Sequence, residues 1–214
     1  KYLGPVPDDK KTITIHQLLT HSSGLPASLG SDDEAISRDS LVSLAMATPL
    51  LFEPGTAYEY SNVGYSLAAA IVEKVSGKAY EEFLGELWRK AGLTRTGQFS
   101  LNLPDSLVAR SHNAALGYPS QTDLPPESWH LVGNGGILST PWDLYHWYSW
   151  LQTDKAISAS ARKKMFTPHV REGEMQSSYG YGWVIQESKR RGGQVIWHNG
   201  GAMPQGWSCA LYHY

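Results

Sequence analysis

The chain has 214 residues, of which 41% are hydrophobic and 18% charged, a composition ordinary for a globular protein with a sizeable core. Its formal net charge of -2 offers no basic surface for nucleic acid, so we expect no nucleic-acid partner. No stretch approaches the length of a transmembrane helix. The single cysteine, Cys209, cannot form an internal disulfide, and its alternating strand-like surroundings predict a small buried thiol.

The first part of the chain predicts short helices. Residues 14–21 read as a helix that ends at Ser22-Ser23-Gly24. A second helix is predicted from Asp39, which can cap it, to a stop near Pro49. Residues 63–75 are apolar nearly all round, which is typical of a helix in the middle of a domain.

The middle of the chain predicts two further helices separated by a long connection. One shows a single apolar face made by Tyr80, Phe83, Leu84, Leu87 and Trp88. Residues 97–136 are rich in Pro, Asn, Ser and Gly and predict a loop that borders a site. Another helix is predicted after Thr140, with Thr140 as its cap and Pro141 in its first turn.

After Pro168 the hydrophobic period changes to two, which predicts strands. The segments are 179–187, 194–198 and 206–212, with glycines at the turns between them. Helices followed by antiparallel strands predict an α+β fold in which helices flank an antiparallel β-sheet, with a mostly helical subregion. We expect residues 1–214 to form a single, incomplete domain cut at both ends.

Two motifs stand out. Tyr60-Ser61-Asn62 follows a turn and opens the apolar helix, and His198-Asn199-Gly200-Gly201 ends a predicted strand. Together they resemble two of the three active-site elements of the β-lactamase and penicillin-binding-protein superfamily of serine hydrolases. The third element, a Ser-x-x-Lys that supplies nucleophile and base, should precede both and is absent from the sequence. We expect the nucleophile upstream of Lys1.

The resemblance extends over the whole chain, because three more segments of the family follow in the same order. These are 12–25 (Thr-Ile-Thr-Ile-His-Gln-Leu-Leu-Thr-His-Ser-Ser-Gly-Leu), 135–144 (Gly-Gly-Ile-Leu-Ser-Thr-Pro-Trp-Asp-Leu) and 179–183 (Tyr-Gly-Tyr-Gly-Trp). Each motif alone is weak, whereas five in order make coincidence improbable.

The resemblance implies a role for each candidate residue. Tyr60 would face the serine and lysine as a proton shuttle, its pKa lowered by the ammonium. Asn62 would donate its amide to a substrate carbonyl. His198 and Gly200 would line the site along a strand edge, and the Gly201 N–H would be one oxyanion donor. From the residues alone, each polar group could instead be a helix cap or a satisfied strand-end histidine, and Ser61 reads as a cap and spacer.

Two other patterns carry no site. Ser160-Ala161-Arg162-Lys163 fits Ser-x-x-Lys but follows the Tyr-x-Asn motif, and a solvated helical face explains it. His16 and His21 are five residues apart, which does not give a shared helical face, and no His-Glu-x-x-His occurs. We therefore expect neither a metal nor another cofactor.

The resemblance implies hydrolysis of an amide or ester bond through an acyl-enzyme, with a small molecule or a peptide as substrate. The His-x-Gly in place of Lys-Thr-Gly favours a peptidase (such as a carboxypeptidase) or an esterase; a β-lactamase is the alternative. A catalytically inactive relative that binds peptidoglycan or protein is the other alternative. Family analogy favours a periplasmic or secreted protein, and the oligomeric state stays open.

Overall fold

A computed structural model describes residues 2–98, 108–109, 128–188, 190, 192–202 and 207–213, with the backbone alone at 202 and 207. Most of the predicted loop at 97–136 therefore lies outside the described residues. Within them, no helix is both long enough and apolar enough to cross a membrane.

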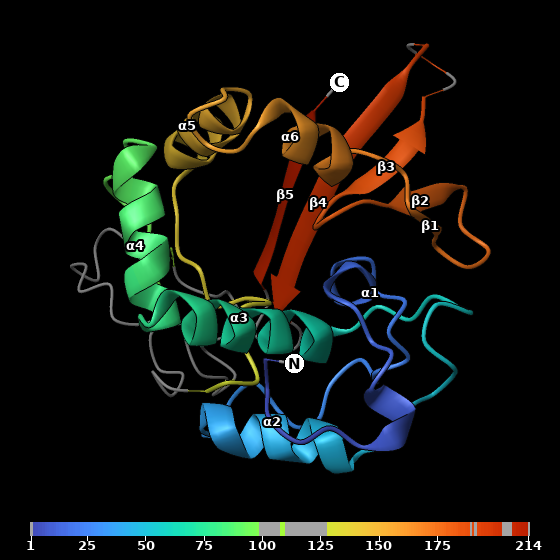
Figure 1. The fold of residues 1–214 in the computed structure, drawn as a ribbon. Coiled ribbons are helices and arrows are strands. Elements are labelled where there is room, and N and C mark those ends of the chain that lie inside the picture. The colour runs from blue at the N-terminus through green and yellow to red at the C-terminus, as the bar shows by residue number, and fades with distance from the viewer. Residues whose placement is uncertain are drawn as a thin grey trace.

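In Figure 1, α1, α2 and α3 lie in the lower part of the molecule, α5 and α6 lie in the upper part, and the sheet lies to one side of them. The helix α3 runs through the middle of the molecule, with α2 on one side and the lower end of the sheet on the other. The bounds are η1 (Asp8–Lys10), α1 (Ile15–Leu19), α2 (Arg38–Ala47), α3 (Asn62–Ser76), α4 (Tyr80–Lys90), α5 (Pro141–Leu151) and α6 (Ala159–Met165).

Local sequence explains where the first two helices begin. Thr14 and Gln17 form a capping box at the start of α1, in which each side chain satisfies the other residue's backbone N–H. The prediction that Asp39 caps α2 is wrong, because Ser37 is the N-cap and its Oγ accepts from the Ser40 N–H at 3.2 Å. Asp39 lies inside the first turn, where a negative charge interacts favourably with the helix dipole.

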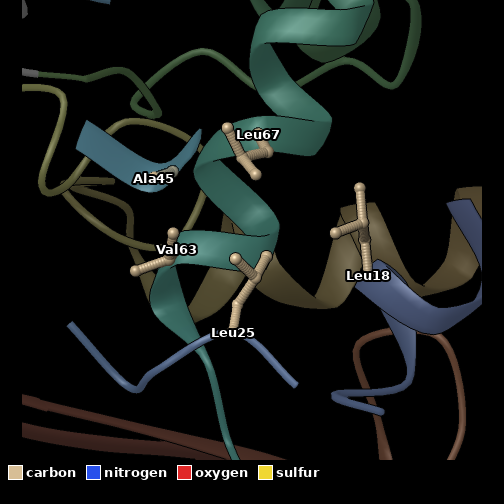
Figure 2. Close-up of a cluster of buried hydrophobic side chains, with 5 residues drawn as sticks. All are labelled: Leu18, Leu25, Ala45, Val63 and Leu67. Atoms are coloured by element: carbon tan, nitrogen blue, oxygen red, sulfur yellow. The ribbon is translucent and has the colours of Figure 1, made fainter. Parts of the chain in front are cut away.

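The central position predicted for the apolar helix is confirmed by the burial of α3. Figure 2 shows a buried cluster that joins α3 to α1, α2 and the loop after α1. Its members are Leu18, Leu25, Ala45, Val63 and Leu67. Gly64 allows α1 and α3 to approach closely, because a Cβ on Gly64 would lie 3.2 Å from the Leu18 carbonyl oxygen.

The sheet has five antiparallel strands in the order β1-β2-β3-β4-β5. Their bounds are β1 (Val170–Arg171), β2 (Ser177–Tyr179), β3 (Val184–Glu187), β4 (Gln194–Ala202) and β5 (Trp207–His213). The prediction of one strand over 179–187 is wrong: a turn at 180–183 divides it, with Gly182 at φ +80°. The strand predicted at 194–198 continues to Ala202.

Helices α5 and α6 lie on the other side of the molecule from α2 and connect to the sheet (Figure 1). Thr140 caps α5 as predicted, its side chain accepting from the Asp143 N–H at 3.1 Å. The Tyr148 hydroxyl on α5 lies 2.7 Å from His213 Nδ1 on β5. At the end of α6, the Met165 carbonyl accepts from the Tyr181 N–H at 3.0 Å and so holds the turn between β2 and β3.

The predicted burial of Cys209 is wrong, because its thiol is exposed on β5. Cys209 pairs with Gly200 of β4, and a Cβ on Gly200 would lie 2.9 Å from Cys209 Sγ. The neighbouring glycine has no side chain with which to cover the thiol. Among the described strands β5 is also the last of the sheet, so no further strand covers it.

Candidate active site

Ser61 holds the start of α3 in place. Its Oγ accepts from the Gly64 N–H at 3.1 Å and donates to the Pro26 carbonyl at 2.7 Å, and the residue is 1% exposed. The prediction that Ser61 is a cap is confirmed. The next residue, Asn62, donates its N–H to the Ala27 carbonyl at 2.9 Å. The loop after α1 therefore fixes the backbone on which both Tyr60 and Asn62 stand.

Tyr60 and Asn62 are the accessible members of their motif. Tyr60 keeps 41% of its surface exposed, whereas Ser61 between them is buried. Asn62 is partly buried and lines a small cavity together with Ser66 and His130. The exposed phenol of Tyr60 and the cavity lined by Asn62 are both able to meet a ligand.

The phenol of Tyr60 is held neutral in this chain. Partial burial raises its pKa, the negative charge of Glu172 raises it further, and a hydrogen bond with Tyr179 acts in the opposite direction. Glu172 is 8% exposed and accepts from the Tyr58 hydroxyl at 3.0 Å. The charge that acts on Tyr60 from the described residues is thus the negative charge of Glu172. A lowered pKa at Tyr60 requires a cation from another segment.

His198 lies close to Tyr60, with 6.3 Å between the ring centroids. Its Nδ1 is 2.7 Å from the carbonyl oxygen of Asn199, so this nitrogen carries the proton. Its Nε2 is 2.8 Å from the Tyr179 hydroxyl and therefore accepts a hydrogen bond from that hydroxyl in the neutral ring. The pKa of His198 is lowered, chiefly by burial, and the Asn199 carbonyl and Glu172 oppose the shift.

Tyr179 is 1% exposed and connects the strand side of the site to the helix side. Its ring centroid lies 5.9 Å from that of His198, 6.2 Å from that of Tyr60 and 4.5 Å from that of His21. Burial raises the pKa of Tyr179 far above its ordinary range, so the hydroxyl stays protonated and remains a donor.

Gly200 and Gly201 continue β4 beyond His198. On one side β4 pairs with β5 from Ile196 to Ala202. On the other side its described pairing with β3 stops at Trp197, opposite Val184. Residues 198–202 therefore offer backbone groups along an edge that no described strand occupies, which suits an extended ligand. For Gly200 the structure adds a second reason for glycine, since Cys209 Sγ occupies the space of a side chain.

The structure thus brings Tyr60 and His198 together, places Asn62 at the start of α3 beside Tyr60, and puts Gly200 and Gly201 on the strand of His198. Sequence reasoning missed His21, Glu172 and Tyr179. In the sequence, Tyr179 was noted only as part of the motif at 179–183, and no pattern around Glu172 indicated a role in the site. His21 stood at the end of a predicted helix where glycine is common, which could have drawn attention to it.

The misleading Ser-x-x-Lys pattern lies elsewhere. Ser160 and Lys163 are exposed on α6, and Ser158 caps that helix. Within the described residues no group of three or more His, Cys, Asp or Glu side chains is arranged to hold a metal ion.

Helices packed around an antiparallel sheet in this order are the fold of β-lactamase and transpeptidase proteins. A penicillin-binding protein from Bacillus halodurans aligns with a TM-score of 0.74 and 25% identity, over 89% of this chain and 63% of that one. A β-lactamase/D-alanine carboxypeptidase from Yersinia pestis has the same fold, with a TM-score of 0.73 and 21% identity over 98% of this chain and 63% of that one. The predicted α+β fold is confirmed.

The family itself is shown by sequence. The Beta-lactamase family model matches residues 1–213. A penicillin-binding protein of Bacillus subtilis (strain 168) is 31% identical over 211 residues, which are 88% of this chain and 46% of that protein. The chain belongs to the β-lactamase family of serine hydrolases, and the predicted resemblance is confirmed. The chain spans 46% of the length of that protein and 45% of the length of a second, putative penicillin-binding protein of Bacillus subtilis (strain 168).

Proposed function

We propose that this chain is the larger part of a serine hydrolase domain that cleaves an amide or ester bond through an acyl-enzyme. In this proposal a Ser-x-x-Lys segment upstream of Lys1 supplies the nucleophile and its base. Tyr60 passes the proton, Asn62 holds the lysine and the substrate carbonyl, and the Gly201 N–H contributes to the oxyanion site.

The observation that carries the proposal is the meeting of Tyr60 and His198. Tyr60 stands just before the N-terminus of a central helix, and His198 stands on a strand whose edge at 198–202 no described strand occupies, yet their ring centroids are 6.3 Å apart. An acyl-transfer site needs a proton-transfer group and a surface that positions the acyl chain at the same place. The exposed Tyr60 phenol supports the first role, and the edge at 198–202 supports the second.

The state of His198 supports an esterase, or a peptidase that does not bind a carboxylate through this residue, over an enzyme that depends on a charge contact between His198 and a substrate carboxylate. Both ring nitrogens are engaged, by Tyr179 and by the Asn199 carbonyl, and the pKa is lowered. A neutral imidazole at pH 7 supplies no positive charge for a substrate carboxylate. We therefore assign His198 to the shape and hydrogen bonding of the site, and propose a small peptide or ester as substrate.

The test is covalent labelling of the full-length protein. Incubation with a fluorophosphonate, or with a penicillin, followed by intact mass measurement, should add one equivalent to the protein. Peptide mapping should place the adduct on the serine of an upstream Ser-x-x-Lys. The 214-residue chain by itself should take up none, because Tyr60 and Asn62 have no nucleophile to serve in it.

A Ser160→Ala variant is the matched control, since it removes the other serine of a Ser-x-x-Lys pattern. Its labelling should equal that of the unmodified protein. Labelling at Ser160, or of the 214-residue chain alone, would contradict the proposal. A full-length protein that binds a peptidoglycan fragment without becoming labelled would instead support the catalytically inactive relative.

A further inference from the structure

His21 occupies a backbone position that normally suits glycine. It follows Thr20, the C-cap of α1, and has φ +57°, which makes it the one non-glycine residue with positive φ in the described chain. The Ser22 N–H closes the end of the helix by donating to the Gln17 carbonyl at 3.0 Å. At this place in a helix end, glycine adopts the left-handed conformation at no steric cost, whereas a residue with a Cβ adopts it less readily.

The side chain and the carbonyl of His21 hold the backbone on both sides of Tyr60. The Glu59 N–H donates to the His21 carbonyl at 2.9 Å. The Ser61 N–H donates to His21 Nδ1 at 3.0 Å. The residues on both sides of Tyr60 are therefore hydrogen-bonded to one residue, which is 1% exposed.

The imidazole ring also supports the phenol directly. Its centroid lies 4.2 Å from that of Tyr60, with 38° between the ring planes. On its other sides it contacts Tyr65 at 5.1 Å and Tyr179 at 4.5 Å between centroids. Tyr65 is held in turn, because its hydroxyl donates to the Leu19 carbonyl at 2.9 Å.

The ring has a single protonation state at neutral pH. Because Nδ1 accepts from a backbone N–H, the proton is on Nε2, and Nε2 is buried without a hydrogen-bond partner among the described residues. Burial lowers the pKa of His21 to about 3, and the charge of His198 acts in the same direction. Nδ1 of His21 is thus an uncharged acceptor. Histidine carries two costs at this position, the left-handed backbone and a buried Nε2–H without a partner among the described residues.

We propose that His21 is a positioning residue for the reaction: its Nδ1 and its ring fix the orientation of Tyr60 through the Ser61 N–H and through ring contact. This inference rests on the proposed function of Tyr60 as the proton-transfer group. It adds a residue that does not touch the reacting atoms, and it explains the strained backbone by what the side chain does.

The experiment compares His21→Asn with His21→Gly in the full-length protein. Asparagine and glycine both tolerate positive φ, and both remove the ring, but only asparagine keeps an acceptor near the place of Nδ1. Hydrolysis of a p-nitrophenyl ester is measured at a temperature at which the unfolding curve shows each variant to be folded. For His21→Gly, kcat should fall on the order of 100-fold with little change in KM, because a misplaced proton-transfer group affects the chemical step. His21→Asn should recover about tenfold of that loss.

Hydrogen exchange of the Ser61 amide gives a readout that needs no activity. The amide should be protected in the wild-type protein and in His21→Asn, and should exchange faster in His21→Gly. In the wild type, the ¹⁵N shifts of His21 should report an unprotonated Nδ1 and a protonated Nε2 from pH 5 to pH 8.

Equal kcat values in the two variants, or loss of kcat strictly in proportion to loss of stability, would overturn the positioning role. A protonated Nδ1 in the wild type would overturn it even if neither variant folds. The wild-type protein could instead show the expected tautomer and a protected Ser61 amide but neither labelling nor hydrolysis. That result would contradict the proposed function and therefore the catalytic role of His21. The hydrogen bond between Ser61 and His21 would still be established.

Discussion

The hydroxyl of Tyr179 lies 2.8 Å from Nε2 of His198 and is its hydrogen-bond donor. The direction follows from the other ring nitrogen, because His198 Nδ1 faces the carbonyl oxygen of Asn199 at 2.7 Å and must carry the proton. The Asn199 carbonyl thereby sets the tautomer of the partly buried His198, and the hydroxyl of Tyr179, which is 1% exposed, completes it by donating to Nε2. The same tyrosine packs against His21, so a single buried ring links the strand side of the site to the loop that carries Tyr60.

The first prediction concerns Tyr60. In the full-length protein, Tyr60→Phe keeps the ring that packs on His21 and removes only the hydroxyl, so folding should be unaffected. Loss of a positioned proton-transfer group should lower kcat by about 100- to 10,000-fold. The measurement is steady-state hydrolysis of an ester and a peptide. Tyr80→Phe on α4 is the control, and its rate should equal that of the wild type; an unchanged rate for Tyr60→Phe would reduce Tyr60 to a packing residue.

The second prediction concerns the charge at His198. Its pKa is below the ordinary value of 6.5, so the ring stays neutral as pH falls from 8 toward 6.5 and gains no charge for a substrate carboxylate. The Michaelis constants of a carboxylated substrate and a neutral ester should therefore change in parallel over this range. His198→Lys places an ammonium near the Tyr179 hydroxyl and should lower KM for the carboxylated substrate alone.

The control for this substitution is His198→Gln, which adds no charge and should affect both substrates alike. A wild-type KM that rises with pH for the carboxylated substrate only would show that His198 titrates in this range and reads substrate charge. Such a result would remove the support that His198 gives to a peptidase or an esterase.

The third prediction is a loss of stability in acid caused by His21. In the unfolded chain His21 binds a proton below its ordinary pKa of 6.5, whereas in the folded chain its pKa is about 3. Between these values the unfolded state binds more protons, so the free energy of unfolding falls as pH falls. Through His21 alone, the free energy of unfolding at pH 4 should be lower than at pH 7 by about 3 kcal/mol at most.

Urea unfolding of the wild type and of His21→Asn at pH 7 and at pH 4 measures this share. The wild type should lose more stability than the variant on acidification, because other titrating groups act in both proteins and cancel in the difference. An equal loss in the two proteins would mean that His21 is not buried in its neutral form.

The fourth prediction tests the core that carries the helix of the site. Leu67 on α3 is 3% exposed within the cluster of Figure 2, and Leu67→Ala should lower the free energy of unfolding by about 2–5 kcal/mol. Val75 on the same helix is 67% exposed, so Val75→Ala should change it by less than about 0.5 kcal/mol. Chemical denaturation gives both values, and similar losses in the two variants would contradict the assigned core.

Local patterns were sufficient to predict several elements. The caps Thr140 and Ser61 and the central helix after Tyr60 follow from neighbouring residues, because capping and a 3.6-residue hydrophobic period act within a few positions of the chain. The cap of α2 was assigned to Asp39 instead of Ser37, since two nearby side chains could serve and only the backbone geometry selects between them. The break between β2 and β3 was missed because the apolar alternation continues across it.

By itself the sequence determined the family, the α+β class and the candidates Tyr60, Asn62, His198, Gly200 and Gly201, because ordered motifs survive in the linear chain. Only the tertiary structure decided that the Tyr179 hydroxyl donates to His198, that Cys209 is exposed opposite Gly200, and that the rings of His21 and Tyr60 are in contact. The physical reason is distance along the chain. His21 and Ser61 are 40 residues apart, and Tyr179 and His198 are 19 apart, so these contacts depend on how helices and strands pack. Burial then sets the pKa of each group, and burial is a property of the folded chain.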